Sequence, residues 1–347
     1  MFFFRLDANS KIGLGHLKRC LVLADELKKS GVTCYFLTFA SDLASVSTLI
    51  IKHQHQHYIL DNEVIGQQTS DALICLKFIQ SQVGTKKCCI LILDHYDLGT
   101  EWEEIFLKNF KLLVFDDFGQ RKTKADFILN FSPNEDDNLS KTGKNLVGVQ
   151  YALISENYLQ KKITSFEIRK SRTQLKRLII SFGGADGHNM TYFSLQTALN
   201  ALPGIEIHCT AKKTFKLFHE LQELSDKDSR IHLYPNLEDL SDLCVEADLA
   251  IGAGGISLLE KCCLGLPTIV IQTADNQNKN LEFLIKKECI IYAGNFQSVT
   301  RSSLEGVLLY YLNHFHELNK ISQNSFHLID GKGAIRVADF LVANLPQ

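Results

Sequence analysis

Short apolar runs alternate with longer stretches of helical spacing along this chain, and that alternation limits its fold more than any other feature. In the first half the apolar runs are residues 2–6, 33–39, 88–93 and 111–115. Between the first two, residues 16–30 place their apolar side chains on one broad face, as an amphipathic helix does. Strands that alternate with helices in this way are typical of an α/β domain with a parallel sheet.

The second half repeats the same order of elements. We predict a strand over residues 178–182, a turn at Gly183-Gly184 and a helix over 195–202, followed by further strands. A length of 347 residues also favours two hydrophobic cores over one. We therefore predict two Rossmann-like domains. The predicted parts are an N-terminal domain over 1–160, a linker over the polar and basic residues 161–177, a second domain over 178–330 and a closing C-terminal helix over 331–347.

The predicted topology also indicates where a ligand binds. In open parallel sheets, ligands bind beyond the carboxyl ends of the strands, at the point where the strand order reverses. Two such domains can turn their strand ends toward each other. We therefore expect the two parallel sheets to face each other across a cleft that holds the substrate.

The net charge, the cysteines and the lengths of the apolar runs limit which classes of partner and which compartment the sequence allows. A formal net charge of -2 leaves no basic surplus for nucleic acid or an anionic membrane, so we expect a small-molecule substrate. The ten cysteines are scattered, with adjacent pairs at Cys88-Cys89 and Cys262-Cys263 and no zinc-type CxxC pairs. Such usage favours buried thiols in a reducing compartment. No apolar run approaches the roughly 20 residues of a membrane span. We expect a monomeric cytoplasmic protein.

The first glycine turn, Gly13-Leu14-Gly15-His16, directly follows a strand and opens a helix. Free amides and the positive end of a helix dipole favour anionic groups there, although a purely structural turn is the alternative. The dinucleotide fingerprint needs a third glycine where this chain has Lys18, which argues against NAD. The helix terminus disfavours an imidazolium, so His16 is a candidate general base, the alternative being a packing or surface histidine.

A second glycine turn, Gly252 to Ser257, opens a helix that carries Glu260. The amides of Gly254, Gly255, Ile256 and Ser257 could hold a diphosphate, while the Glu260 carboxylate could accept hydrogen bonds from ribose hydroxyls. A helix start with an exposed glutamate is the alternative.

Polar residues at two further strand ends complete the candidate site. Gly183, Gly184 and Asp186 form a third turn that could line the cleft. Asp94, His95 and Tyr96 follow the run Ile90 to Leu93, where they are placed to reach the substrate, and helix capping by Asp94 is the alternative. Asp94 and His95 are the reserve candidates for the catalytic base.

We predict no metal and no cofactor. His53, His55 and His57 alternate with glutamines, so in an extended segment all three would point to one side. No carboxylate or cysteine neighbour completes a metal site, and three solvent-facing histidines are the favoured interpretation.

Together these motifs carry a resemblance. The matching segments are residues 4–7, 12–16, 18–19, 93–96, 115–117, 151–154, 182–186, 252–260 and 276–277. The chain resembles the UDP-sugar hydrolases of pseudaminic acid biosynthesis, which release UDP from UDP-2,4-diacetamido-2,4,6-trideoxy-β-L-altropyranose. That family is related to the GT-B glycosyltransferases that make peptidoglycan lipid intermediates. The resemblance therefore implies a GT-B fold and a UDP-sugar substrate.

The resemblance also implies residue roles. It makes His16 the base that activates water, the acceptor, and places Tyr96 close to the sugar. It puts Gly254 to Ser257 and Glu260 around UDP. The remaining residues that it implies for the substrate site are Arg5, Asp7, Gly13, Gly15, Asn276 and Gln277.

Three functions follow from these observations. The leading hypothesis is metal-independent hydrolysis at the anomeric carbon with UDP as leaving group. A glycosyltransferase would use the same donor site and pass the sugar to an acceptor. For a lipid acceptor, the first domain should carry an apolar patch rimmed by Lys and Arg, and the sequence shows no obvious one. A nucleotide-sugar binding protein without turnover is the third hypothesis, against which the position of His16 speaks.

Overall fold

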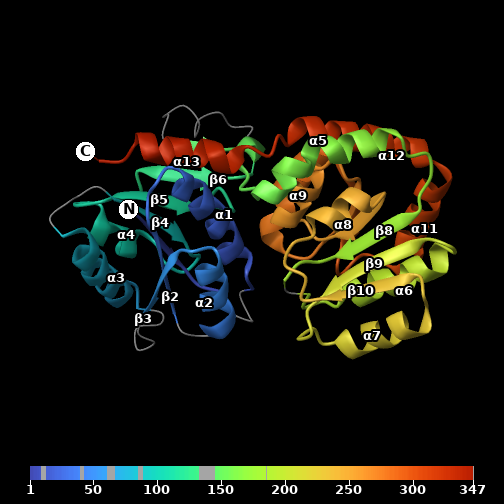
Figure 1. Ribbon diagram of the computed structural model, residues 1–347, viewed down its shortest axis with the longest axis horizontal. Helices are drawn as coiled ribbons and strands as arrows, with labels where there is room; N and C mark the ends of the chain where they lie inside the picture. The colour runs from blue at the N-terminus through green and yellow to red at the C-terminus, as the bar shows by residue number, and fades with distance from the viewer. Residues whose placement is uncertain are drawn as a thin grey trace. The chain divides into compact units, whose positions relative to one another are not determined.

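The chain forms two compact units. The computed structural model describes residues 1–8, 13–39, 43–60, 67–84, 89–132, 145–184 and 186–346. The N-terminal unit comprises Met1–Leu153 together with Lys332–Gln347, and the C-terminal unit comprises Ile154–Gly331 (Figure 1). The end of the chain thus returns to the unit in which the chain begins.

The N-terminal unit is built on a parallel sheet. Its described strands are β1 (Phe2–Leu6), β2 (Cys34–Phe39), β3 (Gln56–Leu60), β4 (Ile90–Asp94), β5 (Lys111–Phe115), β6 (Phe127–Asn130) and β7 (Asn145–Val147). They lie in the order β3-β2-β1-β4-β5-β6-β7, and every neighbouring pair is parallel. The strand order reverses between β1 and β4. The predicted strands over 2–6, 33–39 and 111–115 are present, and Cys88 of the predicted strand over 88–93 lies outside the described residues.

Helices cover both faces of this sheet. They are α1 (Gly15–Lys29), α2 (Leu43–Lys52), α3 (Gln68–Val83), α4 (Thr100–Phe106), the short 3₁₀ helix η3 (Val149–Tyr151) and α13 (Gly333–Ala343). Because strand side chains alternate between faces, Phe3 packs with Trp102 in the core beneath α3 and α4, while Phe4 stacks on Phe36 at the opposite face. The expected closing helix over 331–347 is α13, which packs through Phe340 against Phe127 of β6.

The C-terminal unit repeats the arrangement. Its strands are β8 (Arg177–Ser181), β9 (Glu206–Ala211), β10 (Ile231–Pro235), β11 (Leu249–Gly252), β12 (Thr268–Gln272) and β13 (Ile291–Asn295), in the order β10-β9-β8-β11-β12-β13. All neighbouring pairs are parallel, and the order reverses between β8 and β11. Numbered from its own first strand, this unit therefore has the same strand order as the first six strands of the other.

The helices of this unit also lie on both faces of its sheet. They are α5 (Glu156–Lys170), α6 (Met190–Ala201), α7 (Phe218–Lys227), α8 (Ser241–Glu246), α9 (Ile256–Cys263), η4 (Asp275–Gln277), α10 (Asn278–Lys286), α11 (Arg301–Asn313) and α12 (Phe315–Leu328). Ile180, Ile207 and Ile251 form the centre of the core with Leu195 of α6 and Leu304 of α11.

The expected linker over 161–177 is mostly helical instead. Residues 161–170 are the second part of α5, and two of the basic side chains that suggested a solvated linker, Lys162 and Arg169, are buried. Arg169 donates to the carbonyls of Cys244, Ala247 and Leu264, at the ends of α8 and α9. Burial and, to a lesser extent, the charge of Arg172 together lower the pKa of Arg169 to about 9.

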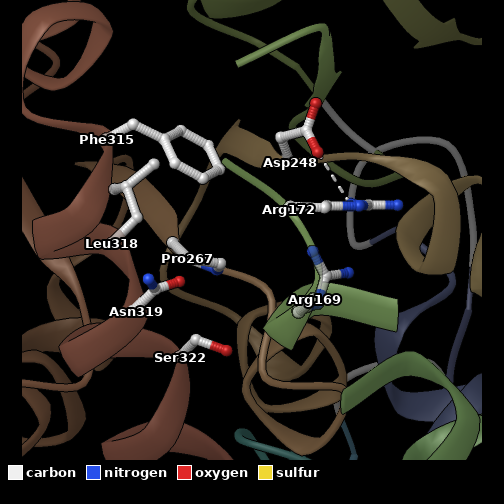
Figure 2. Close-up of a pocket in the computed structure, with 8 residues that line it drawn as sticks. All are labelled: Arg169, Arg172, Asp248, Pro267, Phe315, Leu318, Asn319 and Ser322. Atoms are coloured by element: carbon white, nitrogen blue, oxygen red, sulfur yellow. Dashed lines mark ion pairs between the residues drawn. The ribbon is translucent and has the colours of Figure 1, made fainter. Parts of the chain in front are cut away.

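Arg172 completes this arrangement. It donates to the carbonyls of Val245 (3.0 Å) and Glu246 (2.8 Å) and pairs with Asp248 at 2.9 Å. Figure 2 shows the two arginines across from Phe315, Leu318 and Ser322 of α12. These residues line a cavity of about 10 Å³. Cationic side chains at the carboxyl end of a helix satisfy its last carbonyls, so the polar composition here reflects helix capping.

Two further features bear on the expectations from composition. Within the described part of the chain, every helix is too short or too polar to cross a bilayer. The cysteines in that part, including Cys89 and the adjacent residues Cys262 and Cys263, are all buried.

Candidate functional site

Ionisable side chains gather at the carboxyl edge of the N-terminal sheet, where its strand order reverses. Asp7 follows β1, Asp94 ends β4, and Asp117 lies two residues after β5. Helix α1 starts at the same edge and carries His16 and Arg19 in its first turns. The topology that predicted a ligand site at this edge thus brings carboxylates, a histidine and a guanidinium together.

The His16 imidazole is held by Asp94. Nδ1 of His16 lies 2.7 Å from Oδ1 of Asp94 and 3.1 Å from Nη2 of Arg19. A carboxylate can only accept, and it is the closer partner, so the hydrogen belongs on Nδ1 and points to Asp94. This tautomer leaves the lone pair on Nε2, where a general base needs it.

Arg19 bridges two carboxylates. Its Nε donates to Oδ2 of Asp94 at 2.6 Å, and its Nη1 donates to Oδ1 of Asp117 at 2.7 Å. The hydroxyl of Tyr96 donates to Oδ2 of Asp117 at 2.6 Å, and its ring meets the His16 ring edge-to-face with centroids 4.9 Å apart. Asp94, Arg19 and Asp117 therefore fix the two predicted site residues His16 and Tyr96 from one side.

Asp94 stays ionised in this setting. Burial alone would raise the pKa of its carboxyl, but the charge of Arg19 and the contact with His16 outweigh burial and hold that pKa well below its ordinary value. Asp94 is 1% exposed. A buried carboxylate of fixed charge both orients an imidazole and stabilises the imidazolium that forms when the ring takes a proton.

A second network lies beside the first. Arg5, fully buried, donates from Nη1 to Asp7 at 2.6 Å and from Nη2 to Asp71 of α3 at 2.6 Å. Trp102 of α4 donates its indole N–H to the same Asp71 at 2.7 Å. Burial would raise the pKa of Asp7, but hydrogen bonding from His95 and the charge of Arg5 hold it well below the ordinary value. Arg5 therefore positions Asp7 from inside the core, and its predicted contact with substrate stays a prediction.

The reserve base candidate His95 has both ring nitrogens engaged. The backbone N–H of Asp97 donates to Nδ1 at 3.0 Å, so the hydrogen is on Nε2, which donates to Oδ2 of Asp7 at 2.9 Å. Taking a further proton at Nδ1 would break the first of these bonds. The geometry therefore favours His16 over His95 as the base.

The carboxyl edge of the C-terminal sheet is made mostly of backbone. A Cβ on Gly252 would lie 2.5 Å from the carbonyl oxygen of Ser181, so glycine is required where β11 passes β8. Gly255 is different: it has an ordinary extended conformation, with φ -80° and ψ -165°, and a Cβ there would meet no described atom within 4 Å. Neither strain nor packing requires glycine at that position. Because glycine has no side chain, the first amides of α9 are left uncovered.

Gln277 holds this turn in place. Its Oε1 accepts from the amides of Gly254 (3.2 Å) and Thr273 (3.0 Å). Because Gly254 is engaged, the amides at the start of α9 that have no acceptor among the described residues are those of Gly255, Ile256 and Ser257. Ser257 and Glu260 stand three residues apart and so share one helix face.

Asn276 precedes Gln277 in η4 and is partly exposed. It therefore lies in the segment that Gln277 joins to the glycine turn, and its predicted role near the sugar or phosphates stays a prediction.

The remaining predicted residues have structural roles in the first instance. Gly183 follows β8 with φ +82°, a conformation that favours glycine, and Gly184 lies beside Lys212. Both oxygens of Asp186 accept from the first amides of α6, those of Met190 and Thr191, each at 2.8 Å. Asp186 thus caps a helix, while Ala185 lies outside the described residues.

In the first turn, Gly13 has φ +84°, and a Cβ on Gly15 would meet no described atom within 4 Å. Ile12 and the three residues before it lie outside the described residues.

The expectation of three solvent-facing histidines is wrong. Gln54 has a positive φ of 62°, so the segment turns before β3 and the side chains do not line up. His53 and His55 both bond to Asp25 of α1, at 2.7 and 2.8 Å, and His55 is buried. His57 lies between the hydroxyls of Thr38 and Ser47.

Several members of the two networks were not singled out as site residues from the sequence. Arg19 and Asp117 belonged to matched segments, and the i, i+3 spacing of His16 and Arg19 on a helix was the available signal. Asp71 and Trp102 come from α3 and α4, and no local pattern connects them to Arg5.

Comparisons with known proteins support the fold and the resemblance. No model of a known protein family matches the chain. An uncharacterized protein of Methanocaldococcus jannaschii is 26% identical over 297 residues, which covers 81% of this chain and 57% of that protein. The chain thus spans little more than half the length of that relative.

A second relative carries a function in its name. The UDP-2,4-diacetamido-2,4,6-trideoxy-β-L-altropyranose hydrolase of Campylobacter jejuni is 28% identical over 295 residues, covering 82% of this chain and 96% of that protein. The similarity expected from the sequence motifs is thereby confirmed.

Among solved structures, MurG of Acinetobacter baumannii matches with a TM-score of 0.70 and 14% identity, covering 99% of each chain. At that identity the match concerns the fold alone. It confirms the predicted α/β architecture of GT-B type, with two Rossmann-like units.

Proposed function

We propose that this protein hydrolyses a UDP-sugar at the anomeric carbon, releasing UDP and the free sugar, with His16 as the base that activates water. The observation that carries the proposal is the bond between His16 Nδ1 and buried Asp94 at the start of α1, 2.7 Å long. The similarity to the Campylobacter jejuni hydrolase supports UDP-2,4-diacetamido-2,4,6-trideoxy-β-L-altropyranose as the substrate and pseudaminic acid biosynthesis as the setting.

The proposed step needs one base. Nε2 of His16 takes a proton from water while the water oxygen bonds to the anomeric carbon. The bond from that carbon to the diphosphate oxygen breaks, and its electron pair leaves with UDP. The imidazolium that forms lies against ionised Asp94, which stabilises the new positive charge. A diphosphate leaves as an anion, so the step requires no second proton donor.

The C-terminal unit supplies the nucleotide site in this proposal. The amides of Gly255, Ile256 and Ser257 bind the diphosphate, and preorganised donors of this kind also stabilise the charge that develops as UDP leaves. The Glu260 carboxylate accepts hydrogen bonds from ribose hydroxyls. The uncovered space at Gly255 supports this assignment, because a side chain there would shield the amides.

A glycosyltransferase and a binding protein without turnover are the competing functions. A transferase would use the same donor but pass the sugar to an acceptor other than water, and a binding protein would leave the UDP-sugar intact. The paired imidazole favours turnover, because a binding site has no need of an oriented base.

Hydrolysis in ¹⁸O-labelled water separates these functions. The protein is incubated with a panel of UDP-diacetamido-trideoxyhexoses and with UDP-N-acetylglucosamine, and the products are analysed by mass spectrometry. We expect UDP without label and a free sugar carrying one ¹⁸O. Label in the nucleotide would show attack at phosphorus and contradict the mechanism. UDP release that depends on an added acceptor would show a transferase, and intact UDP-sugar after prolonged incubation would show a binding protein.

A further inference from the structure

Two neighbouring strands of the C-terminal sheet present three metal-ligating side chains on one face. His208 of β9 and His232 of β10 are directly opposite each other in the parallel register. Glu206 precedes His208 by two residues and therefore lies on the same face. One ligand atom from each of these three side chains lies within 4.8 Å of the others. The sheet thus forms a cluster of two imidazoles and one carboxylate, and the pairing of β9 with β10 brings His232 to the other two.

His208 carries the strongest sign of a missing partner. Its Nε2 is buried and makes no hydrogen bond within the described part of the chain. Its Nδ1 lies 3.0 Å from the hydroxyl of Tyr234, and Nε2 lies 3.9 Å from Oε2 of Glu206. When Nδ1–H donates to the Tyr234 oxygen, Nε2 carries the lone pair. Metal-bound histidines are characteristically fixed in this way through their other nitrogen. The His208 and His232 rings stack with centroids 4.9 Å apart, so the His232 ring turns when both bind one ion.

Arg177 competes for the carboxylate. Its Nε donates to Oε2 of Glu206 at 2.8 Å, and its Nη1 pairs with Glu246 at 3.0 Å. An ion that binds Glu206 displaces the first contact, and Arg177 keeps the second. Glu206 is exposed and lines an open hollow of about 720 Å³, so an ion has a path from solvent.

The ligand set selects the class of ion. Two imidazoles and one carboxylate suit zinc and neighbouring transition metals, whereas calcium and magnesium prefer sites made of oxygen ligands. Three protein ligands leave a fourth position for water. We propose that Glu206, His208 and His232 bind one divalent transition-metal ion of the zinc type, with Tyr234 orienting His208.

The site ties the edge strand β10 to β9 and stabilises the C-terminal unit. Glu206 is the first residue of β9 and His232 the second of β10, whereas the proposed nucleotide site lies beyond the carboxyl ends of β8 and β11. The ion therefore has a structural role and takes no part in the proposed hydrolysis.

Metal titration of the full-length protein tests the proposal. The chain is stripped with a chelator, then titrated with Zn²⁺ by calorimetry and with Co²⁺ by visible absorption. We expect one ion per chain at the cluster. His208→Ala and His232→Ala should each weaken Zn²⁺ binding at least tenfold, because losing even an outer-shell partner typically costs about 10- to 100-fold.

A matched control separates the site from surface histidines. His219 of α7 is exposed and lies 3.2 Å from Glu223, so His219→Ala removes a comparable histidine–carboxylate pair and should leave the affinity unchanged. Glu206→Gln keeps the size of the side chain and removes its charge, so it tests the site without opening a gap. It should also weaken binding at least tenfold.

Three results would overturn the proposal. The wild-type chain could bind no Zn²⁺, or the His208, His232 and Glu206 variants could bind it as tightly as wild type. Alternatively, the ion could be lost on replacing His53 and His55, which would place it at Asp25 in the other unit. Circular dichroism of each variant confirms that its fold is intact, and Glu206→Gln decides if a histidine variant fails to fold.

Discussion

The two units share a strand order but differ at their carboxyl edges. The N-terminal edge holds carboxylates and guanidinium groups locked to one another, with His16 fixed on Asp94. The C-terminal edge presents helix amides beside Gly255 and a turn held by the neutral amide of Gln277. Charged side chains that are held rigid can move a proton, and uncovered amides can bind an anion. In the proposed function, one topology thus serves two kinds of chemistry, and the residues placed at the strand ends decide which.

The largest expected effect comes from removing the proposed base at the N-terminal edge. His16→Ala should reduce turnover by about 10²- to 10⁴-fold, the usual contribution of a positioned base. UDP affinity should change little, because the nucleotide is assigned to the other unit. Steady-state UDP release and calorimetry with UDP measure the two quantities.

Comparison with a neighbouring histidine makes this test specific. His95→Ala should retain more turnover than His16→Ala, since both nitrogens of His95 are already engaged. UDP release by His16→Ala within a few-fold of wild type would exclude His16 as the base, and the Asp94 and His95 variants would then identify it.

The next effect concerns the partner of the base. Asp94→Asn keeps the shape of the side chain but removes the charge that stabilises the imidazolium, so turnover should fall at least about tenfold. KM and UDP affinity should stay close to wild type, because Asp94 bonds to His16 and Arg19 and the proposed nucleotide site lies in the other unit. A rise in KM with unchanged kcat would instead give Asp94 a role in binding.

The third prediction addresses the proposed nucleotide site at the C-terminal edge. Glu260→Ala should weaken UDP binding by roughly 1 to 3 kcal/mol, because ribose hydroxyls lose their acceptor on binding. Glu282→Ala on α10 is the control: this residue is exposed in the same unit and should leave affinity unchanged. An unaltered dissociation constant for Glu260→Ala in calorimetry would argue against the assigned nucleotide site.

Low pH should destabilise the N-terminal unit before it destabilises the C-terminal unit. The pKa values of Asp7 and Asp94 are lowered in the folded state, against burial, by Arg5, Arg19 and the adjacent histidines. A lowered folded pKa contributes stability above the unfolded value, near 3.9, that is lost as pH falls through the folded value. In the C-terminal unit the pKa values of Glu206 and Asp228 are lowered mainly by exposed arginine pairs, which solvent screens.

Hydrogen exchange measures this difference strand by strand. Between about pH 4 and 2 we expect β1 and β4 to lose protection before β8 and β11. Equal loss in both units, or earlier loss in the C-terminal unit, would show that the buried network is not what sets acid stability.

The sequence predicted the scaffold better than the contacts within it. The strand over 2–6 was predicted with its observed bounds because buried parallel strands are continuous apolar runs. The glycine turns placed His16 and Gly255 at strand ends for the same reason. The interpretation of residues 161–177 as a linker failed because burial of Arg169 depends on carbonyls at the ends of α8 and α9. No local sequence pattern reveals these contacts. The bond from Trp102 to Asp71 is equally non-local.

The smallest expected effect is on turnover when metal ions are removed, where we expect no change. Turnover should survive excess EDTA, because the carboxylates at the N-terminal edge are already paired with guanidinium groups and the C-terminal turn offers amides rather than carboxylates. The same treatment should lower the unfolding temperature of zinc-loaded protein, since an ion that binds only the folded state stabilises it. The control is His208→Ala, whose unfolding temperature EDTA should not change. Loss of turnover in EDTA, restored by magnesium or manganese, would mean that the reaction depends on an ion and that the amides of the C-terminal edge do not neutralise the leaving diphosphate alone.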